Sequence, residues 1–343
     1  MKFRRTLTAA AVAVLSLSAT GCVRGALMNA GGTYTIKFAH VTTAATPKGQ
    51  AADFFAADVE KRTNGRVRVQ VYPNSELYGD KDEMQAIQSN SVQMLAPASA
   101  KFTTVAPALQ VLDLPYLFET PDEIPQVAAP DTQVGRAIYA NKDLEAKGMK
   151  VLGLWDSGMK QIHSNNRTVS PSDMVGKKYR IQPSDVLRTQ FEKWGGIPTP
   201  LAFAEVYNGL QQGVIDGGEN TWSNIQSQKM HTVQKYITAS DHGYIGYVLI
   251  INKSFFDELP PDLQRDVEAS ATEASRVNRE RSAQLELESR KKIEATGNTE
   301  IVSLTPEQRQ TLRDAVLPSV YLQYRDAIGP EIVDELLARK KLR

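Results

Sequence analysis

Apolar and polar residues alternate along several short segments of the chain, and this period of two predicts β-strands. The predicted strands cover residues 34–39, 66–72, 92–96, 149–155, 177–182, 214–217 and 247–252, and a second set of elements opens with 158–164. Between them, apolar residues recur at helical spacing and predict helices at 50–62, 82–90, 134–147, 185–194 and 203–212. Alternating strands and helices are typical of an α/β fold, in which helices cover a largely parallel sheet.

One segment departs from this alternation. Residues 262–295 contain neither Gly nor Pro and are rich in Ala, Glu, Arg and Leu. At 1.5 Å per residue, one helix over this segment is roughly 50 Å long, which exceeds the width of a single domain. Its apolar positions do not keep a heptad over several repeats, which disfavours a coiled coil. We therefore expect a helix that braces two domains.

The first residues have the pattern of an export signal. Basic residues among the first five precede an uncharged apolar run over 8–19, which is too short to span a bilayer. The run ends in LSATGC, whose last residue is Cys22. Small residues before a cysteine predict lipoprotein processing, with a diacylglycerol on the Cys22 thiol. The alternative is an ordinary signal peptide cut near Ala19 or Gly21, with Cys22 incidental.

Length and charge narrow the class of protein. The formal net charge of +1 falls to about −2 when the three basic residues of the leader are removed, and the remaining charges are interspersed. This distribution predicts no nucleic-acid partner. The mature part, about 320 residues, is more than one core usually holds, so two domains are expected. We expect a soluble body, because no later apolar stretch reaches the ~18–20 residues of a membrane helix.

Catalytic motifs do not emerge from the sequence. It contains no GxSxG, no Walker sequence and no GxGxxG after a predicted strand. The four histidines do not have metal-ligand spacing. Asp216 and Glu219 are near each other, but on a predicted turn they favour a structural role over a glycosidase pair. The expectation is a protein without catalytic residues, cofactor or metal, with a secreted enzyme as the less favoured alternative.

Two segments, KKYRIQ at 177–182 and GVIDGGEN at 213–220, resemble the extracytoplasmic solute receptors of tripartite ATP-independent periplasmic (TRAP) transporters. More narrowly, the chain is similar to the branch that binds C4-dicarboxylates. Further matching segments are TPKGQ at 46–50, VYPNS at 71–75, SAKF at 99–102, DLPYLF at 113–118, FAEVY at 203–207 and NIQSQKMH at 224–231. The resemblance runs from about residue 34 to the C-terminus and depends on the order and spacing of all these segments.

The resemblance implies a two-lobed periplasmic-binding-protein-like α/β fold, with hinge strands and a long helix that bridges both lobes. The implied division is a signal peptide at 1–21, a lipid-anchored linker at 22–33, a first lobe at 34–157 plus 246–285, and a second lobe at 158–245 plus 286–343. It also implies a monomer that closes on a small organic acid outside the cytoplasm and delivers it to the TRAP permease subunits. The alternatives are another organic acid as cargo, such as a 2-oxo, aromatic or sugar acid, or presentation of the ligand to a sensor kinase.

Arg180 and Asn220 are the first candidates for the ligand site. Arg180 takes the place of an arginine that pairs with the ligand carboxylate in the family, and its guanidinium fork suits bidentate binding. Alternation along 177–182 turns Tyr179 and Ile181 to the opposite face. Asn220 offers an amide to a carboxylate. It is alternatively the N-cap of a helix that follows a turn over 216–220.

A second carboxylate requires further groups. Lys48 and Lys101 are the candidates, because both follow predicted strand ends, where ligands of α/β sheets bind; a solvated surface role is the alternative for each. Ser99, Lys160, His40 and Trp222 complete the candidate ligand-binding residues. Trp222 is alternatively a core residue. Trp155 is expected to pack in the hinge rather than to line the pocket.

Overall fold

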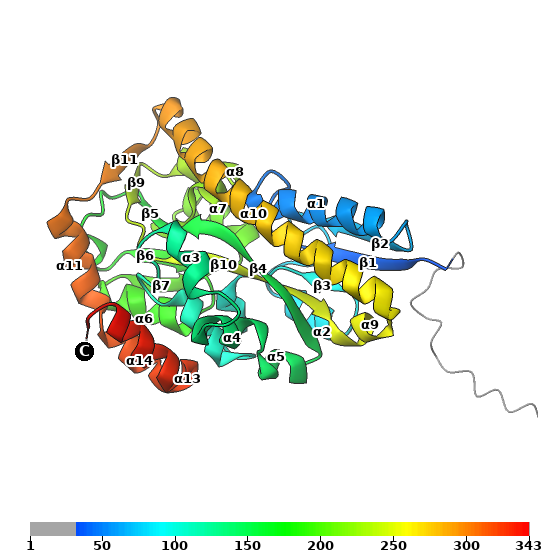
Figure 1. Cartoon of the computed structure of the whole chain (residues 1–343). Coiled ribbons are helices and arrows are strands. Elements are labelled where there is room, and N and C mark those ends of the chain that lie inside the picture. Colours follow the sequence, from blue (N-terminus) through cyan, green and yellow to red (C-terminus); the bar gives the residue numbers. More distant parts are fainter. Residues whose placement is uncertain (1–31, 343) are drawn as a thin grey trace, which may run out of the picture.

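The computed structural model describes residues 32–342, so the predicted signal peptide, Cys22 and most of the predicted linker lie outside the described residues. The described residues form two β-sheets surrounded by helices (Figure 1). The helices are α1 (Pro47–Arg62), α2 (Glu83–Gln88), α3 (Ile124–Val127), α4 (Gln133–Tyr139), α5 (Lys142–Ala146), α6 (Asp185–Lys193), α7 (Val206–Gln211), α8 (Trp222–Ser227), α9 (Lys253–Glu258), α10 (Pro261–Thr296), α11 (Pro306–Val316), α12 (Ser319–Gln323), α13 (Arg325–Ile328) and α14 (Pro330–Arg339). Among them, none is long and apolar enough to cross a membrane.

The first sheet has the order β2-β1-β3-β10-β4 and is the centre of the first lobe. Its strands are β1 (Tyr34–Ala39), β2 (Val67–Tyr72), β3 (Met94–Leu95), β4 (Met149–Met159) and β10 (Tyr244–Asn252). β1 runs parallel to β2 and β3, whereas β10 runs antiparallel to β3 and β4. Phe38 of β1 packs against Phe55 of α1 and Trp155 of β4, with ring centroids 6.1 and 5.8 Å apart. Trp155 is therefore a core residue.

The second sheet has the order β11-β9-β5-β8-β6-β7 and is the centre of the second lobe. Its strands are β5 (Gln161–Ser164), β6 (Lys178–Ile181), β7 (Ile197–Pro200), β8 (Gly217–Asn220), β9 (Tyr236–Ala239) and β11 (Glu300–Ser303). β6 runs parallel to β7 and β8, and β5 runs antiparallel to β8 and β9. The carboxyl ends of β6 and β8 therefore meet at one edge of the sheet, where ligands of α/β proteins bind.

The chain passes between the two sheets along two strands. Lys160 is the only residue between β4 of the first sheet and β5 of the second. Residues 240–243 make the return passage from β9 to β10. The backbone N–H of Lys160 donates to the carbonyl of Gly243 over 2.8 Å, which ties the two passages together. The predicted two-lobed α/β fold with hinge strands is confirmed.

Helix α10 is the third connection between the lobes. It packs against α1 and β4 of the first lobe and against α8 of the second, and it extends from α9 past α1 towards β11 (Figure 1). Asn278 accepts a hydrogen bond from the N–H of Asp156 in β4. Farther along, Glu286 accepts from the N–H groups of Trp222 and Ser223 over 3.0 and 2.8 Å, and so caps α8. The predicted brace is confirmed.

Two predicted elements were wrong. The strand predicted over 214–217 is found three residues farther along the chain, as β8 (Gly217–Asn220). Most of the residues predicted as a turn, 216–220, therefore belong to this strand. Asn220 is consequently not an N-cap, because Thr221 has that position before α8. The predicted helix over 134–147 is two helices, since Asn141 accepts from the N–H of Leu144 and starts α5.

Candidate functional site

A cavity lies between the two lobes, with about 320 Å³ of empty space among its atoms, part of it open to solvent. It is lined by Val41, Thr42, Asp80, Ala98, Gln182, Phe203, Asn220, Asn224, Ile245 and Tyr247. The first lobe supplies the residues up to Ala98 and the two on β10, and the second lobe supplies the remainder. A ligand here touches both lobes at once, which is the arrangement that couples binding to closure.

Arg180 lies on β6, two residues before Gln182, which follows the end of the strand and lines the cavity. The residue is 3% exposed. Its Nε donates to the carbonyl of Leu201 over 2.9 Å, and no other hydrogen bond of the guanidinium is made within residues 32–342. Burial lowers the pKa of Arg180, although Asp80 and Glu219 act against this. The side chain remains a cation, and the two NH₂ groups of its guanidinium are available as hydrogen-bond donors.

Asn220 ends β8, beside Arg180 in the same sheet, since Arg180 pairs with Gly218. Its Oδ1 accepts from the N–H of Thr221 over 3.0 Å and from Nδ2 of Asn224 over 2.9 Å. The carbonyl half of the amide is therefore engaged, and its NH₂ half is the part available to a ligand. An NH₂ group donates to a carboxylate without adding charge.

Lys48 is fully buried in the first turn of α1, at 1% exposure, so it is not a solvated surface lysine. Its Nζ donates to the carbonyl of Ala96 over 3.2 Å and lies 3.7 Å from the centroid of the Tyr247 ring. Burial lowers the pKa of Lys48 to about 8, with Glu83 and Asp80 acting in the opposite direction. The nearby His40 is also buried, and burial together with Lys48 lowers its pKa to about 3, so its imidazole is neutral.

Lys101 does not line the cavity itself but forms an ion pair with Asp80, which does. Its Nζ lies 2.8 Å from Asp80 Oδ1 and 4.0 Å from Glu83 Oε1, and its side chain is 7% exposed. The other Asp80 oxygen accepts from the N–H of Phe203 in the second lobe over 2.5 Å. Burial alone would raise the pKa of Asp80, but Lys101, the Phe203 N–H and Arg180 hold it below its ordinary value. Asp80 is therefore an anion that connects Lys101 to the opposite lobe.

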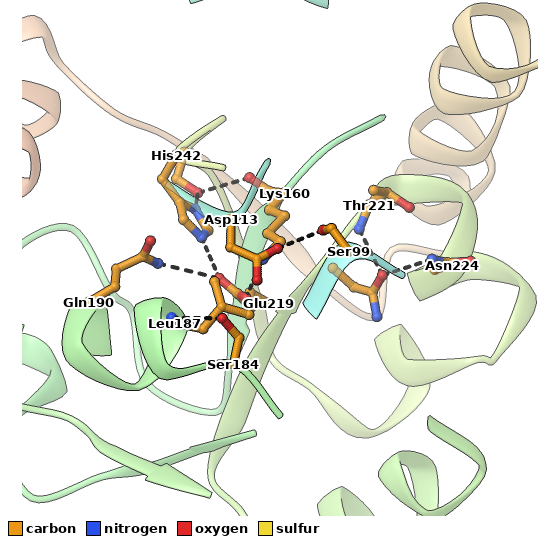
Figure 2. A network of polar contacts seen from close by, with 12 residues as sticks. Ser99, Asp113, Lys160, Ser184, Leu187, Gln190, Glu219, Thr221, Asn224 and His242 are labelled. Atoms are coloured by element: carbon orange, nitrogen blue, oxygen red, sulfur yellow. Dashed lines mark hydrogen bonds and ion pairs between the residues drawn. The ribbon is translucent and has the colours of Figure 1, made fainter. Parts of the chain in front are cut away.

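Ser99 and Lys160 belong to a polar network beside the cavity (Figure 2). Ser99 Oγ donates to Asp113 Oδ1 over 2.6 Å. Lys160 Nζ lies 2.6 Å from Glu219 Oε1, and His242 Nε2 lies 2.7 Å from the other Glu219 oxygen. Burial opposes the Glu219 charge, yet Lys160 and His242 hold its pKa at about 2. These contacts hold the hinge together, and neither Ser99 nor Lys160 lines the cavity.

Trp222 lies outside the cavity lining. It belongs to an apolar cluster of the second lobe, with Phe203 and Ile225 among its members, and is 6% exposed. The Arg290 guanidinium of α10 lies 5.4 Å from its ring centroid. This environment is that of a core residue, which was the alternative interpretation of Trp222.

Asn220 is the one predicted residue in the cavity lining, and the polar lining residues that the site prediction lacked are Thr42, Asp80, Gln182, Asn224 and Tyr247. Gln182 had a signal, because it follows Arg180 by two residues in the strand predicted over 177–182. Tyr247 and Asp80 had none, since the fold brings them in from β10 and from the loop before α2. Within residues 32–342, no group of three or more His, Cys, Asp or Glu side chains is arranged to hold a metal ion.

Comparison with known proteins agrees with this geometry. Residues 38–326 match the family described as bacterial extracellular solute-binding protein, family 7. The chain belongs to this family. Its members are receptors that bind solutes outside the cytoplasm rather than enzymes, so this chain is an exported solute-binding protein.

Relatives in the family cover nearly the whole chain. The chain is 40% identical to the C4-dicarboxylate-binding periplasmic protein DctP of Rhodobacter capsulatus over 87% of this chain and 88% of the relative. It is 34% identical to the C4-dicarboxylate-binding protein DctB of Bacillus subtilis over 89% and 86%.

Solved structures in the family share the fold. A TRAP periplasmic solute-binding protein of Shewanella oneidensis with bound succinate has a TM-score of 0.85 at 37% identity, covering 89% of this chain and 99% of that chain. The counterpart from Pseudomonas aeruginosa with bound L-malate has a TM-score of 0.81 at 36% identity, covering 84% and 99%. The resemblance to TRAP solute receptors is therefore confirmed.

Proposed function

We propose that this receptor binds a C4-dicarboxylate such as succinate, malate or fumarate, with one carboxylate on Arg180 and Asn220. The observation that carries this proposal is the convergence of unused donors at one sheet edge: the Arg180 fork and the Asn220 NH₂ group. A planar fork and an adjacent amide suit the two oxygens of a carboxylate. Relatives that are named for C4-dicarboxylate binding, and structures that contain succinate or malate, support the same cargo.

The second carboxylate interacts with the first lobe, where Lys48 and Lys101 supply positive charge. Lys48 is buried against Tyr247, which itself lines the cavity. Lys101 acts through Asp80, with which its Nζ forms an ion pair of 2.8 Å. His40 is neutral and close to Lys48, so it supplies a hydrogen bond rather than charge. Ser99 and Lys160 act on the ligand indirectly, by holding Asp113 and Glu219, and Trp222 acts as packing for α8.

We also propose that the receptor delivers this cargo to TRAP permease subunits, which its likeness to TRAP solute-binding proteins supports. The proposed lobes are 34–157 plus 246–285 and 158–245 plus 286–343, and the closed form is the one that the permease recognises. Presentation of the ligand to a sensor kinase uses the same site. Reconstituting the permease in liposomes tests this step, because uptake of labelled succinate must depend on added receptor.

We further propose that Cys22 carries a lipid that holds the receptor, a monomer, on the outer face of the membrane. The support is the LSATGC sequence at the end of the leader. Two comparisons test the lipid anchor. Membrane association is compared between Cys22→Ser and the wild type, and leader cleavage of the wild type is compared with and without globomycin, an inhibitor of the lipoprotein signal peptidase. If the protein is a lipoprotein, Cys22→Ser loses its membrane association, and the wild type accumulates with its leader uncleaved when globomycin is present. If it is an ordinary exported protein, neither the substitution nor the inhibitor changes its location or cleavage.

The experiment that tests the cargo is a calorimetric and thermal-shift panel on the mature protein. Binding to the native state alone raises the melting temperature, and a ligand at 100 times its Kd adds about 2.7 kcal/mol. Succinate, malate and fumarate are expected to shift the transition, and acetate and butyrate are not. If only a monocarboxylate or a sugar acid raises the melting temperature, the proposed cargo is wrong, and Lys48 and Lys101 are no longer assigned to the site.

A further inference from the structure

The amide orientations of Asn220 and Asn224 are fixed by a backbone group. The N–H of Thr221 lies 3.0 Å from Asn220 Oδ1. A backbone N–H only donates, so the Asn220 atom that receives this bond is its carbonyl oxygen. The Asn224 atom 2.9 Å from the same oxygen must then be a donor, which identifies it as Nδ2. Both side chains thus have one permitted orientation.

The carbonyl oxygen of Asn224 has no hydrogen-bond partner within the described part of the chain. Its Nδ2 is shared among Asn220, the Tyr247 hydroxyl at 3.1 Å and the Ser157 hydroxyl at 3.3 Å. Asn224 is 2% exposed and lines the cavity, and Figure 2 shows it beside Thr221 on the same side of the network. A buried polar atom that lacks a partner is unfavourable unless a bound molecule supplies one.

Only a hydrogen-bond donor relieves this oxygen. A carboxylate has acceptors alone at neutral pH, so it does not pair with another acceptor. An ammonium group is also a donor, and the Asp80 carboxylate in the lining would attract it, but succinate, malate and fumarate, the proposed cargo, do not carry one. A neutral hydroxyl donates without adding charge, and a hydroxyl beside a carboxylate held by Asn220 reaches the adjacent Asn224.

We propose that Asn224 is a specificity-determining residue whose carbonyl oxygen accepts a hydrogen bond from a hydroxyl next to the bound carboxylate. The pocket then prefers a 2-hydroxy dicarboxylate to the same dicarboxylate without the hydroxyl. This inference rests on the proposed function, because it takes the dicarboxylate as the cargo. It adds the selection among dicarboxylates, which Arg180 and Asn220 do not provide.

The first arm of the test uses the unmodified mature protein, so it does not depend on the folding of a variant. Isothermal calorimetry compares L-malate, D-malate, succinate and 2-methylsuccinate. One malate enantiomer is expected to bind about fivefold or more tightly than succinate, as one added hydrogen bond provides. 2-Methylsuccinate is expected to bind more weakly than succinate, because its methyl group meets the unpaired oxygen. Equal binding of malate and succinate would overturn the proposal.

The second arm identifies Asn224 as the cause. In Asn224→Leu, which keeps a similar volume, both acids bind more weakly because Asn220 Oδ1 loses one of its two hydrogen bonds, and the preference for malate disappears. In the matched control Ser157→Ala, the preference for malate persists, because Asn220 Oδ1 still fixes the orientation of Asn224. A preference that survives Asn224→Leu in a folded variant contradicts the assignment. If none of the four acids binds the wild type, the cargo itself is wrong, and the inference falls with it.

Discussion

Lys160 and Glu219 form an ion pair of 2.6 Å in which each side chain is 2% exposed, and Lys160 is the single residue between β4 and β5. Glu219 is also bonded to His242 on the return passage. The pair therefore joins both hinge passages to β8, the strand that ends in Asn220. Stability and site geometry are connected through these two residues.

The Lys160→Met variant is expected to lose about 3–5 kcal/mol of unfolding free energy, because Glu219 becomes a buried charge without its main partner. Urea denaturation at neutral pH measures the loss. The matched control is Lys253→Met, which breaks an exposed pair with Asp257 and should cost under about 1 kcal/mol. Equal losses in the two variants would contradict the structural role of Lys160.

Arg180→Ala is expected to weaken dicarboxylate binding about a hundredfold or more, since a buried, charge-assisted contact is lost. Arg180→Lys should recover little, because a single ammonium group does not reproduce the fork. Calorimetry on folded variants measures both. The control is Arg188→Ala, whose side chain is half exposed and paired with Asp185 on α6. Near-wild-type affinity in Arg180→Ala would remove it from the site.

The lobes are linked near the cavity by an exposed ion pair, Lys81 with Glu205 at 2.8 Å, whose members lie close in sequence to the lining residues Asp80 and Phe203. This contact exists only when the lobes are close together. Lys81→Ala is therefore expected to weaken ligand binding about two- to fivefold at low salt, as an exposed pair provides. The effect should shrink at high salt because the charges are screened. Glu205→Ala should match it, and the double variant should add nothing further.

Stability is expected to fall as the pH drops from about 6.5 to 4. Burial lowers the pKa of His163 to about 4 from its ordinary value of 6.5, so in this window the unfolded chain binds a proton that the folded chain does not. Such a group stabilises the fold above its unfolded pKa and loses this contribution as the pH falls. Replacing His163 by Gln should lower the slope of unfolding free energy against pH by up to about 1.4 kcal/mol per unit. An unchanged slope would show that His163 takes up its proton in the folded state.

The fold could be predicted where local pattern and final environment agree. The strands at 34–39 and 66–72 and the long helix were found because their periodicity is intact. β8 was misplaced because its two glycines indicate a turn. In the structure they allow close approach instead: a Cβ on Gly217 would lie 2.4 Å from the carbonyl oxygen of His163. Such packing is decided by a distant strand and has no local signal.

The site was predictable only in part, for a related reason. Arg180 and Asn220 lie in the segments that carry the family resemblance. Asp80 and Tyr247 acquire their positions from long-range packing, and the role of Asn224 depends on a hydrogen-bond geometry that no spacing encodes. Trp222 has an aromatic ring near these segments in sequence, yet its side chain is buried on another face of α8.

Helix α10 is attached to the first lobe at Asn278 and to the second at Glu286. Only about two turns, roughly 12 Å, separate these attachments. Any rotation of one lobe against the other must bend this short interval, so it behaves as an elastic element with a preferred curvature. Its stiffness then sets the resting angle of the empty receptor. A glycine placed there would change how far the cleft stands open without altering any atom that meets the ligand.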